Sequence, residues 1–359
     1  MRRQPRIWSP PAEHLTVDAF TTDNLEARAA ERGLVFPRSV LAAVVSALDA
    51  GRHIMLTGAP GTGKTSLAYA VADLARDAIH CTGYLAVTAT PEWSSRETVG
   101  DYVDSPEGLV FHPGVFLEAI GNARWLVIDE LNRADFDRAF GPLFTVLANQ
   151  PVILPYKRAG HSEPIAIVPA GAPCPPGTDP ITIPRHWRIM ATMNEFDKQT
   201  LHRLSYALMR RFAFIEVPPA PDDVVRSLIA GPGELVAKLL PVRHFVELGP
   251  ALFIDAARFT ARRMAEPDAT PSRVLFEAFY AFLLPQLDQL DEPQARKLFW
   301  VVASHLDGAD ATALERAIRR TTGIPAISTT RASKQGSTKP RPGTAAVRRG
   351  GTRPETVPD

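Results

Sequence analysis

The chain has 359 residues, a formal net charge of +1 and two cysteines. This length exceeds one typical domain and allows a sizeable buried core, so neither disulfides nor metal ions are needed to hold the fold. Cys81 and Cys174 lie far apart without histidines at ligand spacing, which argues against a disulfide framework and a zinc site. The basic N-terminus lacks a following apolar run and no segment reaches 18 apolar residues. We therefore expect neither a signal peptide nor a membrane span, and favour a cytoplasmic protein.

Two helices are expected before the first strand. Asp23 and Glu26 resemble a capping box at the start of a short helix that Gly33 closes. The second helix has Pro37 near its first turn and Gly51 just past its end.

Five continuous apolar runs follow, each typical of a parallel strand that is covered on both faces. They occupy residues 53–58, 84–89, 123–129, 188–193 and 212–217, and helical patterns separate them. The pattern predicts an α/β fold with a parallel sheet between layers of helices.

A proline-rich stretch, residues 151–185, interrupts this alternation and is too long for an ordinary connection. We expect its two apolar pieces, "PVILPY" and "IAIVPA", to pair as a hairpin and the remainder to be irregular.

The pattern divides the chain into four parts. Residues 1–36 form a lead-in, residues 37–220 an α/β core, and residues 221–324 a purely helical domain. Residues 325–359 carry seven basic and two acidic residues and no aromatic one, which predicts a disordered tail. Such a tail can attract nucleic acid weakly, but we favour a solvated extension without function.

The string "GAPGTGKT" matches the phosphate-binding loop pattern G-x-x-x-x-G-K-[ST] in full, between a strand and a helix. Its glycines let backbone N–H groups converge on phosphate oxygens, and the helix adds its positive dipole end. The lysine reaches the β- and γ-phosphates and the threonine hydroxyl binds Mg²⁺. The expected nucleotide-binding residues are Gly58, Ala59, Pro60, Gly61, Thr62, Gly63, Lys64, Thr65 and Ser66.

The string "WLVIDE" is an apolar strand that ends in two carboxylates. Asp129 is expected to hold the Mg²⁺ shell, and Glu130 to take a proton from the attacking water. Asn194 ends another apolar run, and a parallel strand there would bring its amide to the same edge, near the water or the γ-phosphate. The alternative is that Asn194 only caps the next helix.

Arg210 and Arg211 stand just before the last strand. Phosphoryl transfer gains greatly from an arginine on the γ-phosphate, sometimes one supplied by a neighbouring molecule. Alternatively, both arginines are a solvated helix end that the helix dipole favours.

In this order, these stretches resemble the AAA+ ATPases, and more narrowly the branch with McrB-like restriction NTPases, MoxR-type ATPases and dynein-related modules. The resemblance covers about residues 37–220. It is carried by "GAPGTGKT", "GDYVDSPEGLVFHPGVFLEAI", "ARWLVIDELNRADFDRAFGPLFTVL" and "IMATMNEFDKQTLHRLSYALMRRFAFIEV".

The resemblance implies a P-loop NTPase core, a small helical lid and assembly into a ring, usually hexameric, with nucleotide between subunits. Asn194 matches the sensor-1 asparagine, and Arg210 or Arg211 matches the arginine finger that acts on a neighbour. Arg273 sits where the lid often carries a sensor-2 arginine. Residues 102–112 and the proline-rich stretch resemble two inserts that face the ring pore or partners in this branch.

The sequence departs from the McrB-like pattern in two ways. McrB-like GTPases carry Asn-Thr-x-Asp at sensor 1, whereas this chain has Asn194 and Asp197 at the same spacing with Glu195 in place of the threonine. We therefore expect ATP, not GTP, as the nucleotide. No N-terminal DNA-binding domain is visible, so DNA is expected only through a partner.

These features predict a Mg²⁺-dependent ATPase that acts as an oligomeric ring and remodels or loads a partner protein. One alternative is the NTPase motor subunit of a McrB-like restriction or antiphage system with nuclease and DNA recognition on other chains. The other is a nucleotide-gated scaffold with little turnover.

Overall fold

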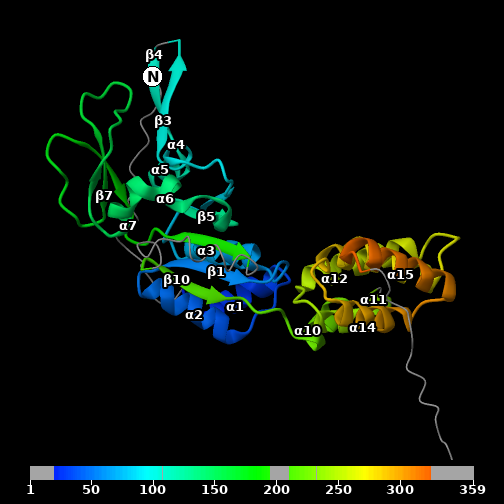
Figure 1. The fold of residues 1–359 in the computed structure, drawn as a ribbon. Helices are drawn as coiled ribbons and strands as arrows, with labels where there is room; N and C mark the ends of the chain where they lie inside the picture. Colours follow the sequence, from blue (N-terminus) through cyan, green and yellow to red (C-terminus); the bar gives the residue numbers. More distant parts are fainter. Residues whose placement is uncertain (1–19, 107, 195–209, 232, 325–359) are drawn as a thin grey trace, which may run out of the picture.

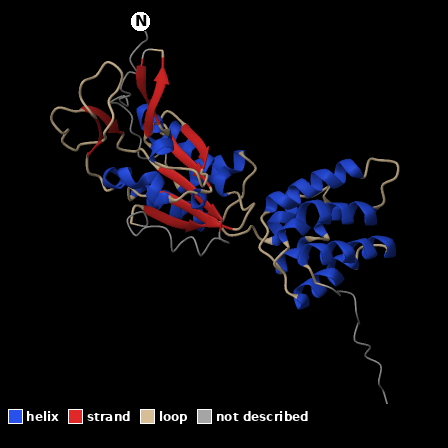
Figure 2. Cartoon of the chain, turned by 45° about the horizontal axis from the view of Figure 1, so that its top comes forward, coloured by secondary structure: helices blue, strands red, loops and turns tan. Residues whose placement is uncertain are grey.

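The computed structural model describes residues 20–106, 108–194, 210–231 and 233–324. Asp197 and the basic tail thus lie outside the described residues. The described chain forms an α/β part with strands and helices, followed by a part built from helices (Figures 1 and 2).

The centre of the α/β part is a parallel sheet in the order β10-β1-β9-β5-β2. Counted along the chain, the first strand of this sheet lies between the fifth and the fourth. The third strand follows next to the fourth, and the second strand lies at the edge. The strands are β1 (His53–Gly58), β2 (Tyr84–Thr88), β5 (Trp125–Asp129), β9 (Ile189–Asn194) and β10 (Phe212–Glu216). The five predicted strands are confirmed, and so is the α/β fold.

Both faces of this sheet are covered. Three consecutive residues of β1, Ile54, Met55 and Leu56, are at most 1% exposed. Because successive side chains of a strand point to opposite faces, this burial requires packing on each face. The helices of this part are α1 (Thr22–Glu31), α2 (Arg38–Asp49), α3 (Lys64–Asp77), α4 (Ser95–Thr98), α5 (Val115–Gly121), α6 (Phe136–Phe140) and α7 (Phe144–Leu147).

The cap of the first helix differs from the prediction. The hydroxyl of Thr21, not a side chain of the predicted capping box, accepts a hydrogen bond from the N–H of Asn24. Asp23 and Glu26 instead form ion pairs with Arg38 at the start of α2. These carboxylates therefore connect the two helices at the protein surface.

Two excursions leave the central sheet. The first is an antiparallel hairpin of β3 (Gly100–Ser105) and β4 (Gly108–Pro113), which projects away from the sheet before α5 (Figure 1). The second is a small sheet in which β6 (Val152–Ile153) pairs antiparallel with β7 (Ile165–Pro169), as predicted. The rest of this insert is not wholly irregular, because β8 (Asp179–Ile183) pairs parallel with β7.

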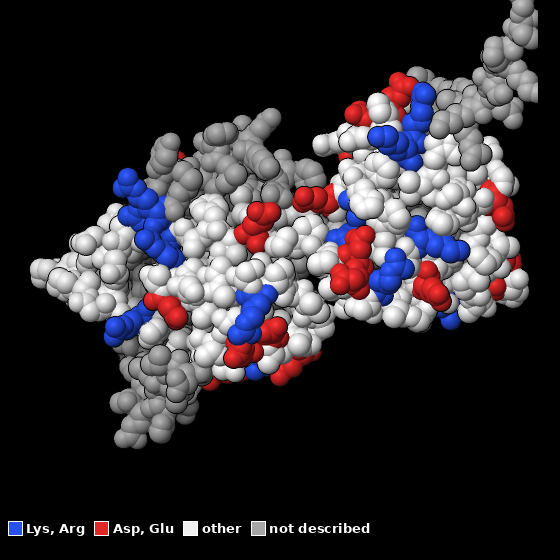
Figure 3. Space-filling view, turned by 90° about the horizontal axis from the view of Figure 1, so that it is seen from below, with Lys and Arg blue, Asp and Glu red and all other residues white. Residues whose placement is uncertain are grey.

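The helical part contains α10 (Asp222–Leu228), α11 (Glu234–Ala237), α12 (Pro250–Arg263), α13 (Pro271–Ala278), α14 (Glu292–Ala303) and α15 (Gly308–Thr322). The buried apolar residues form two clusters, one from Phe20 to Val217 and one from Ala220 to Ile318. Figure 3 shows two lobes, with acidic and basic side chains interspersed over the helical one. Among the described residues, no helix is long and apolar enough to cross a membrane.

Candidate nucleotide-binding site

The phosphate-binding loop connects β1 to α3 at the carboxyl edge of the sheet. Gly58, Gly61 and Gly63 have φ angles of 141°, 75° and 91°, which side chains with a Cβ rarely adopt. At Gly58 the carbonyl of Val217 also occupies the space that a Cβ would need. The glycines are therefore required by the backbone path of the loop.

The loop already surrounds its lysine. Lys64 is 6% exposed, and its ammonium group donates to the carbonyls of Gly58 and Ala59, at 2.8 Å each. The hydroxyl of Thr62 donates to the Ala59 carbonyl at 3.1 Å. Ser66 lies half-buried in the first turn of α3. The start of this helix and the ammonium group thus offer positive charge at one point, which suits phosphate.

The ends of β5 and β9 converge next to this loop and the start of α3. The Thr65 hydroxyl donates to Oδ1 of Asp129 at 2.6 Å, and the Thr192 hydroxyl donates to the same oxygen at 2.6 Å. Thr192 also accepts the N–H of Glu130 at 3.0 Å. One hydroxyl on β9 therefore fixes both acids at the end of β5.

Glu130 has a left-handed backbone, with φ of 52°, which turns its side chain away from the strand direction. One carboxylate oxygen accepts a hydrogen bond from the Asn194 amide at 3.3 Å, and the other pairs with Nε of Arg133 at 2.5 Å. Strained backbone of this kind is often found at functional sites. Asn194 lies opposite Gly58 in the pairing of β9 with β1, so the amide, the acid and the loop share one edge.

The arginines before β10 lie at the opposite edge. Phe212 is paired with His53, the first residue of β1, so Arg210 and Arg211 lie beside the start of that strand. At about 3.3 Å per residue, the six residues of β1 place them about 17 Å from the phosphate-binding loop. These arginines are therefore not brought together with the loop of their own chain.

Arg273 is not brought to the loop either. Its guanidinium pairs with Glu277 at 3.0 Å and with Asp310 at 3.5 Å, and Glu277 also pairs with Arg263 at the end of α12. The start of α12 is the end that touches the loop, where Gly249 lies against Gly61. With a rise of 1.5 Å per residue, the helix separates Arg273 from the loop by about 20 Å.

The sequence did not single out Thr192 or Arg133 as site residues. Thr192 is 1% exposed. The sequence did contain one indication of its role: Thr192 is a polar residue in an apolar strand, two positions before Asn194. Tyr69 is a further neighbour of Asp129. The pKa of its hydroxyl is raised, first by burial and then by the negative charge of Asp129. Tyr69 stacks on Tyr84, with ring centroids 5.0 Å apart.

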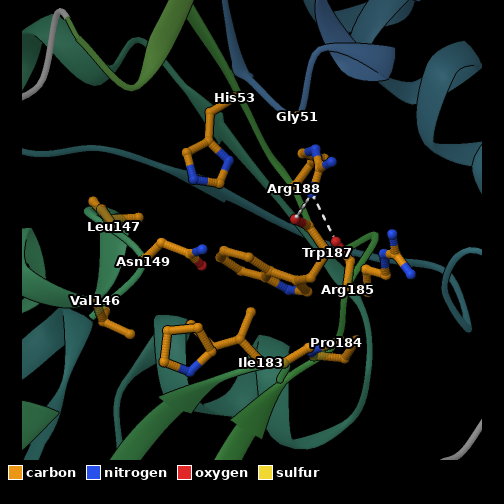
Figure 4. A pocket seen from close by; sticks show the side chains of 12 residues that line it. Gly51, His53, Val146, Leu147, Asn149, Ile183, Pro184, Arg185, Trp187 and Arg188 are labelled. Carbon is orange, nitrogen blue, oxygen red and sulfur yellow. Dashed lines mark hydrogen bonds between the residues drawn. The ribbon is translucent and has the colours of Figure 1, made fainter. Parts of the chain in front are cut away.

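A separate cavity of about 410 Å³ lies at the amino edge of the sheet (Figure 4). His53, Trp187 and Arg188 line it together with Arg185 and Asn149. The cavity contains none of the residues predicted to bind nucleotide, so it is distinct from the site at the carboxyl edge.

A model of the AAA domain (dynein-related subfamily) matches residues 53–212, which begin at β1 and end at the start of β10. The matched residues form an AAA+ domain, and the likeness places this domain in the McrB-like and MoxR-like branch.

Two relatives show how far the likeness extends. The type IV methyl-directed restriction enzyme EcoKMcrB subunit of Escherichia coli (strain K12) is 24% identical over 196 residues, which cover 53% of this chain and 40% of that protein. Midasin of Dictyostelium discoideum is 30% identical over 95 residues, or 25% of this chain and 2% of midasin. This chain therefore spans less than half the length of either relative.

Proposed function

We propose that this AAA+ chain hydrolyses ATP with Mg²⁺, assembles into a ring and uses turnover to remodel or load a partner protein. The observation that carries the proposal is the set of hydrogen bonds that joins Thr65, Asp129 and Thr192 and, through Thr192, positions Glu130. It holds a carboxylate beside the loop and presents a second one next to the Asn194 amide.

The residues present fit Mg²⁺. The Thr65 hydroxyl and the Asp129 carboxylate meet at 2.6 Å, and both offer the oxygen ligands that Mg²⁺ prefers. Among the described residues, no group of three or more His, Cys, Asp or Glu side chains could hold a metal ion. Water and phosphate oxygens are therefore expected to supply the remaining ligands, as is usual for Mg²⁺. The ion would neutralise charge on the phosphates.

We assign a task in hydrolysis to each residue of the candidate site. Lys64 and the loop N–H groups bind phosphate oxygens, Glu130 accepts the proton of the attacking water, and Asn194 orients that water. Arg210 or Arg211 acts on the nucleotide of a neighbouring copy, because about 17 Å separates both from their own loop. Asp197, which lies outside the described residues, stays a predicted second polar group after Asn194.

The test is the Glu130→Gln variant. The amide keeps the size of the side chain but cannot take a proton, so we expect steady-state phosphate release to fall at least about 100-fold while ATP binding persists. Glu118→Gln, at an exposed acid on α5, is the matched control and should hydrolyse at the wild-type rate. An unchanged rate in Glu130→Gln would contradict the proposal.

A second candidate function rests on the likeness to the restriction enzyme subunit. In this case the chain is the NTPase motor of a restriction or antiphage system whose nuclease and DNA-recognition parts are other chains. Phosphate release is measured with ATP and with GTP, each with and without DNA and a co-purifying nuclease. Stimulation by DNA favours this candidate, whereas the absence of turnover with both nucleotides favours a scaffold.

A further inference from the structure

Three arginines gather where β1 and β10 begin side by side. The N–H of His53 donates to the Arg211 carbonyl at 3.1 Å, and Nη1 of Arg52 donates to the Arg210 carbonyl. Arg52 precedes β1 and is 158 residues from Arg210 in the chain. These two hydrogen bonds fix the turn that carries Arg210 and Arg211 to the start of β1.

The three arginines line one hollow of about 760 Å³, together with the end of α7 at residues 147–149. Of the residues that the structure describes, none that lines this hollow is acidic. Arg52 and Arg210 are exposed, and neither forms an ion pair with any residue that the structure describes. The hollow is therefore lined by three positively charged side chains.

These arginines lie at the amino ends of the strands, whereas the phosphate-binding loop of the same chain lies at the carboxyl ends. The start and the end of β1 are about 17 Å apart, and Arg52 stands at the start while the loop follows the end. A neighbouring copy whose loop faces this edge would bring a triphosphate, the anion of highest charge in the reaction. Arginine suits such a contact because its planar fork binds phosphate oxygens in pairs.

We propose that Arg52 is a positioning residue for the arginines that act on a neighbour's nucleotide. Its hydrogen bond to the Arg210 carbonyl holds the 210–211 turn, and its guanidinium adds a third positive charge to the hollow that receives the triphosphate. The inference rests on the proposed function, since it requires hydrolysis at a site shared by two copies.

The first measurement is the rate of phosphate release by Arg52→Ala. Loss of a hydrogen bond that involves a charged group is expected to lower kcat about 10- to 100-fold, with little change in KM. Arg52→Lys keeps the charge but not the fork, so it should recover only part of the rate. Arg185→Ala is the matched control, because Arg185 is exposed at the same edge but lines the other cavity and not this hollow (Figure 4). It should keep the wild-type rate.

The second measurement shows in which copy Arg52 acts. Lys64→Ala subunits should not bind nucleotide, but they retain the arginine edge, whereas Arg52→Ala subunits retain the loop. An equimolar mixture should hydrolyse ATP several-fold faster than the average of the two variants alone. A misfolded Arg52→Ala protein could not be rescued in this way, so rescue excludes a merely structural role.

Three outcomes overturn the inference. If Arg52→Ala has the wild-type kcat while Arg210→Ala or Arg211→Ala is slow, Arg52 has no positioning role and the proposed function stands. If mixing gives no rescue, Arg52 does not act across two copies. If all three alanine variants keep the wild-type rate, the shared site itself is wrong and the proposed function fails with it.

Discussion

At the scale of single residues, Thr192 organises the acids of the candidate site. Its hydroxyl donates to Asp129 and accepts the N–H of Glu130, so one buried oxygen connects β9 to the end of β5. This N–H belongs to a residue with a left-handed backbone. Removing the hydroxyl would leave a half-buried N–H unpaired at the position that orients the proposed base.

We expect Thr192→Val, which keeps the shape but not the hydroxyl, to slow hydrolysis about 10- to 100-fold. The estimate corresponds to the cost of about 1–3 kcal/mol for an unsatisfied buried donor. Thr192→Ser retains the hydroxyl and should stay within a few-fold of the wild-type rate. Steady-state phosphate release at saturating ATP measures both variants, and equal rates for Val and wild type would refute the role of this hydroxyl.

The sequence predicts the residues of the phosphate-binding loop, Asp129, Glu130 and Asn194 as neighbours because strand ends of a parallel sheet meet at one edge. It does not predict Thr192, since threonine is an ordinary strand residue and only pairing of β9 beside β5 turns its hydroxyl to Asp129. Arg273 shows the converse. Its place in sequence suggests a nucleotide contact, but the length of α12 carries it away from the loop.

At the scale of elements, the contact between the helical part and the phosphate-binding loop is a close backbone approach. Gly249 is the N-cap of α12, and backbone atoms of Gly61 and Thr62 occupy the space that a Cβ on Gly249 would need. Arg243 supports this approach. Its Nε donates to the Leu248 carbonyl at 3.1 Å, and its other nitrogens bind the Ala220 carbonyl and Asp222. Arg243 thus connects Ala220 and Asp222, where the helical part begins, with Leu248, the residue before Gly249.

We expect Gly249→Ala to force α12 away from the loop, because the atoms in its way are backbone and cannot rotate aside. A close-packed contact of this kind costs about 1–3 kcal/mol when a methyl group is added. The Kd for ATP should rise and the Tm should fall. Gly308→Ala in α15, where no atom lies within 4 Å of the added methyl group, should leave the Kd unchanged. Equal ATP affinity in wild type and Gly249→Ala would contradict this role of the contact.

The elements differ in how well their patterns predict them. Continuous apolar runs identify the five central strands, because strands that are buried on both faces must be apolar throughout. β8 lacks such a run and contains Pro180, which a strand tolerates only at the edge of a sheet. This edge position is a property of the tertiary structure, so the sequence predicted an irregular segment instead.

At the scale of the whole molecule, we expect the stability of the fold to depend on pH through the protonation of His53. Burial first, and then the charge of Arg188, lowers the pKa of His53 to about 3. In the fold, Nδ1 of His53 accepts the N–H of Ile189 at 3.0 Å, which requires this nitrogen to be unprotonated. The unfolded chain has an ordinary histidine with a pKa of about 6.5.

Because the folded pKa is the lower one, the contribution of His53 to stability is complete above about pH 6.5 and decreases as the pH falls towards 3. We expect the free energy of unfolding to fall between pH 6.5 and 4.5, measured by urea denaturation at constant m-value. The slope of this free energy against pH gives the number of protons that the chain takes up when it unfolds. In His53→Gln, this number should decrease by up to one. An unchanged slope would show that His53 does not carry the effect.

All five strands of the central sheet point in one direction, which gives the molecule two unlike ends: one with the phosphate-binding loop and one with the three arginines. Contacts between unlike ends build either closed rings or open chains. In the proposed assembly, a closed ring completes one site per subunit, whereas an open chain always leaves one loop without arginines. The ratio of working sites to subunits would therefore reveal whether the assembly is closed, independently of its size.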